Sequence, residues 1–284
     1  MFELGANRYG KSRIRLVTVD RATDQHVLRD LTVDVSLEGD FTAAHVDGDN
    51  ANVVATDTMK NTVYAFARDH PTGPAEAFGL AVARHFAAYR QVDRAVVTLR
   101  EHAWTRILLA TGPAPDAFTR SGELTRVAMV AATKSGASVE AGIEDLTVMK
   151  TTKSAFTGFE RDRYTTLAET DDRIMATKVT ALWGYGDTAA EPGFDFDAAF
   201  ERARGTLLTV LAEHFSPSVQ TSIWVMATAM LEAEPAIDWV RMVLPNLHHW
   251  TVNLEPFGLD NPGMVYVSTT EPHGLIDATV RRSG

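Results

Sequence analysis

The order of the expected strands and helices repeats along the chain, and this repeat constrains the fold more than any other feature of the sequence. Both halves are expected to run strand, strand, helix, helix, strand, strand. The first half has these elements at 12–20, 31–38, 58–68, from Pro74 onward, near 94–108 and near 124–133. The second half has them at 138–150, 173–185, about 195–214, about 218–234, 238–254 and 264–281. From this order alone we infer a tandem duplication with domains at 1–138 and 139–284.

The spacing of apolar residues assigns each half to a layer architecture. Every second residue from Leu31 to Leu37 is apolar, which is typical of an antiparallel strand with one covered face. Met59, Val63 and Phe66 share one face of a helix. Each half is therefore predicted to be α+β, an antiparallel four-stranded sheet with two helices on one face. The opposite face and the open edges would need closure or pairing with another chain.

Three segments are expected to be loops. Residues 40–50 are polar, 70–74 carry two prolines, and 111–116 is a proline-rich stretch that predicts an exposed linker. The last proline of 70–74 suits the first turn of the next helix. Thr56 and Asp57 are candidate N-cap residues of the helix before that break. The N–H groups at a helix start suit an anionic ligand, although ordinary capping explains the same residues.

Net charge and the absence of cysteine exclude several classes of function. The formal net charge of −10 argues against a nucleic-acid partner, because phosphate binding needs a basic face. With no cysteine, a disulfide framework, a thiolate zinc site and a cysteine nucleophile are excluded. No signal-peptide core is evident, and no stretch approaches the ~18 apolar residues of a membrane span. The chain also ends without a Ser-Lys-Leu address, so we expect a cytoplasmic protein with no membrane partner.

A short segment near the C-terminus combines an asparagine with two histidines. If this segment is extended, Asn246 and His248 share one face, while Leu247 and His249 point the other way. The adjacent histidines suggest a metal site. We discount it, because strand neighbours point apart and no third ligand is evident.

Three other polar residues have an ordinary interpretation when each is considered alone. Lys11 would be a solvated lysine, and Gln220 a solvated residue in the first turn of a helix. Arg173 would be a surface arginine at a strand start, paired with one of the two aspartates before it.

Six sequence motifs resemble the urate oxidase (uricase) family, in the family's order and across nearly the whole chain. They are YGKSRIRL, VATDTMKNT, FTGFERDRYTTLAETDDRIMAT, SPSVQ, LPNLHH and PHGLIDATV. The resemblance implies the tunnelling fold (T-fold), in which two-domain subunits pair into a β-barrel and dimers stack into a homotetramer with sites at a subunit interface. It also implies that urate, dioxygen and water give 5-hydroxyisourate and hydrogen peroxide. No metal or flavin is implied, because the urate dianion is itself electron-rich enough to reduce dioxygen.

The resemblance assigns roles to individual residues. Lys11 and Thr56 match a proton relay, and with His248 they would handle protons, since a hydroxyl both donates and accepts. Arg173 and Gln220 match the pair that binds the planar substrate from opposite edges. The arginine guanidinium offers a fork of donors, and the glutamine amide both donates and accepts. The other implied contacts are the stacking ring of Phe156, the wall residue Leu167, Asn246 and Thr56 at the oxygen and water site, and the backbone N–H groups of Asp57 and Val219.

Two positions depart from the family, and two alternative functions remain open. Leu247 is often lysine and His249 often aromatic in relatives, but neither is expected to touch the substrate. One alternative is another purine or pterin enzyme of the same fold, such as a cyclohydrolase, which usually needs zinc held by Cys and His. The second is a catalytically silent purine-binding or scaffold protein. The lack of cysteine argues against the first alternative, and the intact catalytic residues argue against the second.

Overall fold

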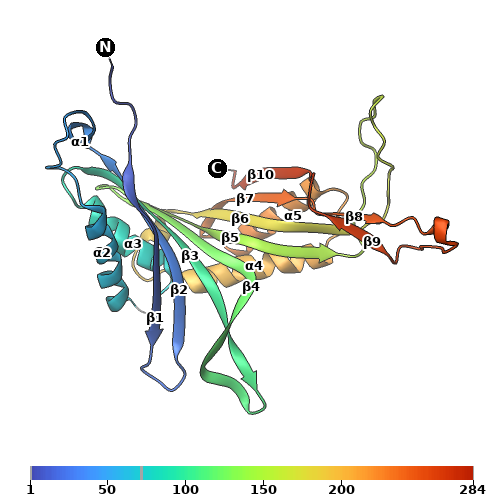
Figure 1. Ribbon diagram of the computed structural model, residues 1–284, viewed down its shortest axis with the longest axis horizontal. Helices are drawn as coiled ribbons and strands as arrows, with labels where there is room; N and C mark the ends of the chain where they lie inside the picture. Colours follow the sequence, from blue (N-terminus) through green and yellow to red (C-terminus); the bar gives the residue numbers. More distant parts are fainter. Residues whose placement is uncertain (1, 71–72, 284) are drawn as a thin grey trace. The chain divides into compact units, whose positions relative to one another are not determined.

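Long antiparallel strands and a few helices form the computed structural model, which describes residues 2–70 and 73–283 (Figure 1). In chain order the elements are β1 Tyr9–Asp20, β2 Val27–Gly39, α1 Thr42–Val46, α2 Thr56–Asp69, α3 Ala75–Ala87, β3 Val92–Leu109, β4 Gly112–Ala132, β5 Ala137–Lys150, β6 Met175–Tyr185, η1 Asp187–Ala190, α4 Phe196–Glu213, α5 Val219–Ala233, β7 Ile237–Pro245, β8 His248–Thr251, η2 Glu255–Phe257, β9 Tyr266–Thr269 and β10 Leu275–Arg281. The fold is thus mixed α/β on an antiparallel sheet, as predicted in outline. Over the residues described, no helix has the length and apolar character that a membrane crossing requires.

Two compact units divide the chain. The first holds residues up to 144 together with 183–200, and the second holds 145–182 together with the residues from 201 onward. The predicted domain boundary after residue 138 falls within β5, so the domain limits stay a prediction.

The first unit orders its strands β1-β2-β3-β4-β5 and packs α2 and α3 against them (Figure 1). The alternation predicted for β2 is confirmed, since Val33, Val35 and Leu37 are each at most 1% exposed. Burial of each such side chain contributes roughly 1.5–3 kcal/mol. Gly79 lets α3 lie close to the sheet, because a Cβ there would come within 2.8 Å of Leu99 Cδ1.

The starts of α2 and α3 differ from the prediction by one residue. Ala55 is the N-cap of α2 and no side chain caps it, so neither Thr56 nor Asp57 is the N-cap. The cause lies upstream: the Tyr9 hydroxyl accepts from the Val54 N–H at 2.8 Å and donates to its carbonyl at 3.1 Å, which fixes the chain just before the helix. The proline before α3 is likewise its N-cap, not a first-turn residue. The two residues at 71–72, part of the predicted break, lie outside the described residues.

The proline-rich linker predicted at 111–116 is wrong, because β4 already begins at Gly112 and pairs with β3. Prolines lack the N–H of a sheet ladder, yet their carbonyls remain acceptors. The Arg106 guanidinium donates to the Ala114 carbonyl at 3.0 Å and also to that of Pro115. The His26 N–H donates to the Pro115 carbonyl at 3.0 Å. These bonds hold the proline segment as strand.

The second unit orders its strands β6-β7-β10, with α5 against β7 and β10. Helices α4 and α5 confirm the two helices predicted for this half. The two long C-terminal strands predicted at 238–254 and 264–281 are each divided in two. Pairing of β7 with β10 ends at Pro245 and Leu275, after which the Leu247 N–H donates to the Ala176 carbonyl of β6 at 2.8 Å. Strands β8 and β9 then form a separate two-stranded sheet.

Candidate active site

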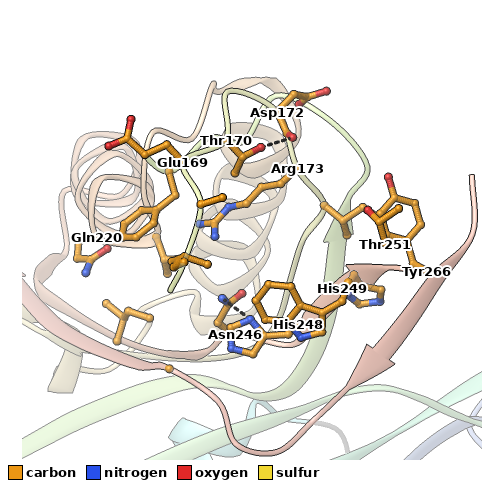
Figure 2. A pocket seen from close by; sticks show the side chains of 18 residues that line it. Glu169, Thr170, Asp172, Arg173, Gln220, Asn246, His248, His249, Thr251 and Tyr266 are labelled. Atoms are coloured by element: carbon orange, nitrogen blue, oxygen red, sulfur yellow. Dashed lines mark hydrogen bonds between the residues drawn. The ribbon is translucent and has the colours of Figure 1, made fainter. Parts of the chain in front are cut away.

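Seven of the predicted site residues lie around one pocket in the second unit, with a volume of about 530 Å³ (Figure 2). They are Phe156, Leu167, Arg173, Val219, Gln220, Asn246 and His248. The other lining residues were not predicted to form a site, and they include His249, Trp250, Thr251 and Tyr266. The period of two that placed Asn246 and His248 on one face also reaches Trp250, and this signal could have found it. Separate stretches of the chain between Phe156 and Ile276 thus converge on one pocket.

Arg173 brings an unpaired positive charge to this pocket. It lies two residues before β6, where its N–H donates to the Ser154 carbonyl at 2.8 Å. The ordinary interpretation, an ion pair with a neighbouring aspartate, is wrong for the described residues: Asp172 accepts instead from the Thr152 hydroxyl at 2.9 Å. The Arg173 Nε is buried without a hydrogen-bond partner, and burial lowers the pKa of its guanidinium. An arginine stays charged nonetheless, so this group favours an anionic ligand.

Phe156 provides a flat apolar surface beside that charge. Its N–H donates to the Thr170 carbonyl at 2.8 Å, which ties the two sides of the loop between β5 and β6 together. Its ring stacks on Phe159 with centroids 4.9 Å apart and planes 11° apart, and the Arg173 guanidinium carbon lies 5.1 Å from its centroid. A fixed aromatic ring next to a cation suits a planar anion.

The start of α5 contributes further polar groups to the pocket. Ser218 is the N-cap, and its side chain accepts from the Thr221 N–H at 3.1 Å. Val219 and Gln220 follow as the first two helical residues, with Val219 buried and Gln220 exposed, as predicted for a first turn. Figure 2 shows the Arg173 guanidinium extending into the pocket between Gln220 and the Asn246–His248 pair. The unpaired N–H groups of a helix start add further positive potential.

Asn246 and His248 lie side by side, as the period of two predicted. The Asn246 Nδ2 is 3.3 Å from the His248 Nδ1, and the His248 ring stacks on Trp250 at 5.1 Å. Burial lowers the pKa of His248, and the charges of Arg173 and two other histidines lower it further. A neutral imidazole at neutral pH can accept a proton.

His249 differs from its prediction. It was expected to point away, yet it lines the same pocket as His248 (Figure 2). Its Nδ1 lies 3.0 Å from the Leu247 carbonyl, so the ring folds back along its own strand. Within residues 2–70 and 73–283 no group of three or more His, Cys, Asp or Glu side chains could hold a metal ion.

The three predicted residues of the first half lie in the first unit and do not line this pocket. Lys11 is on β1, next to a bulge in its pairing with β2, while Thr56 and Asp57 open α2. The pKa of Asp57 is lowered chiefly by its hydrogen bond to Lys60 and in smaller part by the charge of Lys11. The charge of Lys11 therefore acts at the start of α2.

The motif around Tyr9 explains this placement. Gly10 is required, since a Cβ would come within 1.9 Å of the Val35 carbonyl oxygen of the paired strand. The hydrogen bonds of Tyr9 to Val54 then tie β1 to the residues just before Thr56. Together these contacts place Lys11 and the start of α2 on one side of the first unit.

Comparison with known proteins gives one consistent family. The sequence model of the family described as Uricase matches residues 7–131 and 139–277. A uricase from Arthrobacter globiformis is 46% identical over 282 residues, which cover 99% of this chain and 90% of that protein. A uricase from Dictyostelium discoideum is 36% identical over 281 residues, which cover 98% of this chain and 96% of that protein. The crystal structure of the Arthrobacter globiformis uricase superposes with a TM-score of 0.94 at 45% identity, covering 100% of this chain and 96% of that chain.

Proposed function

The chain belongs to the uricase family, and we propose from this premise that it oxidises urate. Urate, dioxygen and water give 5-hydroxyisourate and hydrogen peroxide, so urate loses two electrons and dioxygen gains them. The observation that carries the proposal is the buried, unpaired Nε of Arg173, beside the ring of Phe156 and lining the same pocket as Gln220. A cation, a flat ring and an amide around one pocket suit a planar anion whose edges carry both N–H and C=O groups.

The pocket residues would hold urate in one plane. Arg173 would donate its fork to one edge, and the Gln220 amide would meet the opposite edge with a donor and an acceptor. Phe156 would stack on the purine, with Leu167 as a wall and the Val219 N–H as a further donor. Asn246 would line the position above the ring where dioxygen and then water are placed.

Proton transfer would need groups from the first unit as well. Lys11 and Thr56 would relay a proton, His248 would complete the proton path, and the Asp57 N–H would bind urate. We propose that these residues come from a second copy of the chain, so that each site is completed in trans.

Association into T-fold barrels and then a homotetramer would supply that second copy. Several large apolar side chains of both units are exposed in the single chain, including Leu108 and Met264 at 78% each. Strands β1 and β10 also end their respective sheet orders and offer open edges. Exposed apolar groups and open edges of this kind support pairing between copies. The matched blocks 7–131 and 139–277 flank the proposed domain boundary after residue 138.

The reaction would need no metal or flavin. The urate dianion would supply the electrons, and the protein would orient it and move protons. The absence of cysteine in the sequence supports this view, because thiolate metal sites are excluded.

Urate turnover tests the proposal directly. Purified protein mixed with urate in air should remove the ultraviolet absorbance of urate, with one dioxygen consumed and one hydrogen peroxide formed for each urate. Heat-denatured protein is the control. Binding of urate without dioxygen uptake would instead identify a catalytically silent purine-binding protein and overturn the proposal.

A further inference from the structure

Two buried serine hydroxyls at the start of α5 form a hydrogen-bonded chain that the proposed reaction does not use. Ser216 and Ser222 are both 0% exposed. The Ser222 hydroxyl donates to the Ser216 Oγ at 2.7 Å, and the His214 Nε2 lies 2.9 Å from the Ser222 Oγ. The Ser216 hydroxyl in turn reaches the Ser218 carbonyl at 3.2 Å and the Met175 Sδ at 3.4 Å. The chain therefore ends on the N-cap of α5, one residue before Val219.

The backbone of Ser216 is hydrogen-bonded to the chain segment that leads into Phe156. Its N–H donates to the Lys153 carbonyl at 2.9 Å, and its carbonyl accepts from the Ala155 N–H at 2.8 Å. The segment between those two residues carries the carbonyl that accepts from the Arg173 N–H, and it leads directly into Phe156. Through its backbone, Ser216 is thus bonded to residues 153–155, which hold Arg173 and lead into Phe156. Through its side chain it is bonded to the first turn of α5, which carries Gln220.

We propose that Ser216 is a positioning residue that sets the spacing between the Arg173 guanidinium and the Gln220 amide. This inference rests on the proposed function, in which those two groups grip opposite edges of urate. A rigid planar ligand cannot adjust to a changed spacing between the two groups. The relative position of residues 153–155 and the start of α5 therefore decides whether both edges of the ligand can be hydrogen-bonded at once. A buried hydroxyl chain with every member bonded fixes such a register, whereas an incomplete chain leaves a buried polar group unpaired.

The test is Ser216→Ala, with Thr228→Val as the matched control. Thr228 is on the same helix α5, and its hydroxyl is buried without a hydrogen-bond partner, so its removal breaks no bond. Urate affinity is measured without dioxygen by equilibrium dialysis, and turnover is measured in air. We expect Ser216→Ala to raise the Kd and KM for urate by about tenfold, with kcat within about twofold of the unsubstituted protein. Thr228→Val should keep all three values.

A second variant keeps the inference falsifiable if Ser216→Ala fails to fold. Ser222→Ala removes the donor to the Ser216 Oγ and should raise Kd in the same direction while sparing kcat. The inference is overturned if both serine variants bind urate like Thr228→Val, or if kcat falls while Kd stays unchanged. If the unsubstituted protein does not turn over urate, the proposed function itself fails, and this outcome is distinct because it precedes any comparison of variants.

Discussion

The two units present their predicted site residues in different ways. The second unit gathers seven of them around a pocket, where the buried Nε of Arg173 has no hydrogen-bond partner among the described residues. The first unit holds only Lys11, Thr56 and Asp57, at a strand bulge and a helix start, and Asp57 is exposed and paired with Lys60. Groups suited to recognition of a planar anion are thus concentrated in one unit, and the hydroxyl and amine suited to proton transfer in the other.

This division teaches that binding and turnover can be changed separately. A substitution in the first unit should leave the pocket of the second unit intact, so urate should still bind. A substitution in the pocket should weaken the ground-state complex before any chemistry occurs. Measuring the Kd of urate without dioxygen and kcat in air separates the two effects.

The largest effect is expected from Lys11→Met and Thr56→Ala. Each should lower kcat by about 10²-fold or more, because a proton-transfer group contributes typically 10²–10⁴-fold. The Kd of urate should change far less, and the double variant should be little worse than the worse single variant, since members of one relay act together. Lys134→Met is the control, because Lys134 belongs to the same unit, donates to the Arg90 carbonyl and is not a predicted site residue. Full turnover by Lys11→Met across neutral pH would show that the relay assignment is wrong.

Arg173→Ala should mainly weaken binding. The Kd and KM for urate should rise by about 10- to 100-fold, because charge-assisted hydrogen bonds are lost from a partly buried site. Arg173→Lys should restore little, since an ammonium cannot reproduce the planar fork. Arg163→Ala, in the exposed part of the same loop, serves as the control. An unchanged Kd in Arg173→Ala would contradict the assignment of recognition to the second unit.

Features set by local sequence were predicted well, in the fold and in the site. The alternation of β2 follows from a side-chain period of two, and the same period paired Asn246 with His248. Gln220 was expected in the first turn of a helix, and the structure confirms it, with Ser218 as the N-cap of α5.

Features set by distant partners were not predicted. Residues from Gly112 onward form strand because Arg106 of β3 and His26, just before β2, donate to carbonyls of the proline segment. The break after Pro245 depends on the Ala176 carbonyl of β6, which accepts a hydrogen bond from the Leu247 N–H. Tyr266 reaches the pocket only through the pairing of β9 with β8. Sequence periodicity does not contain this information, because each case depends on which chain segment lies alongside.

Mixed oligomers test whether the two units meet across copies. Thr56→Ala and Arg173→Ala oligomers should each be nearly inactive. In a mixed two-fold dimer, one site carries both lesions and the other carries neither, so random pairing leaves about a quarter of all sites intact. Co-expression with two affinity tags isolates the mixed oligomers, and because one site in two is intact in a mixed dimer, their activity per subunit should approach half that of the unsubstituted protein. Mixed oligomers as inactive as the parents would rule out a site shared between copies.

A smaller effect is expected in the pH dependence of kcat/KM. Burial and the charge of Arg173 lower the pKa of His248, so the neutral form persists below the ordinary histidine value of 6.5. The Asn246 amide can donate to Nδ1 only while that nitrogen carries no proton. Activity should therefore fall on the acid side only below pH 6.5, and Arg173→Ala should move this limb toward higher pH. A limb at or above 6.5 in the unsubstituted protein would contradict the assignment of His248.

The smallest expected effect is that of chelation, which should leave turnover unchanged. Neither the pocket nor the start of α2 contains a group of His, Asp or Glu side chains that could hold a metal ion, within the residues described. In the proposed reaction the urate dianion supplies the electrons, and Lys11, Thr56 and His248 move the protons, so no metal is needed. Protein dialysed exhaustively against a chelator, with metal content measured and the absence of flavin checked by absorbance, should keep the kcat of untreated protein. Protein dialysed against buffer alone is the control for losses on handling. Activity that disappears and returns only when one metal is added would show that the reaction requires a metal cofactor.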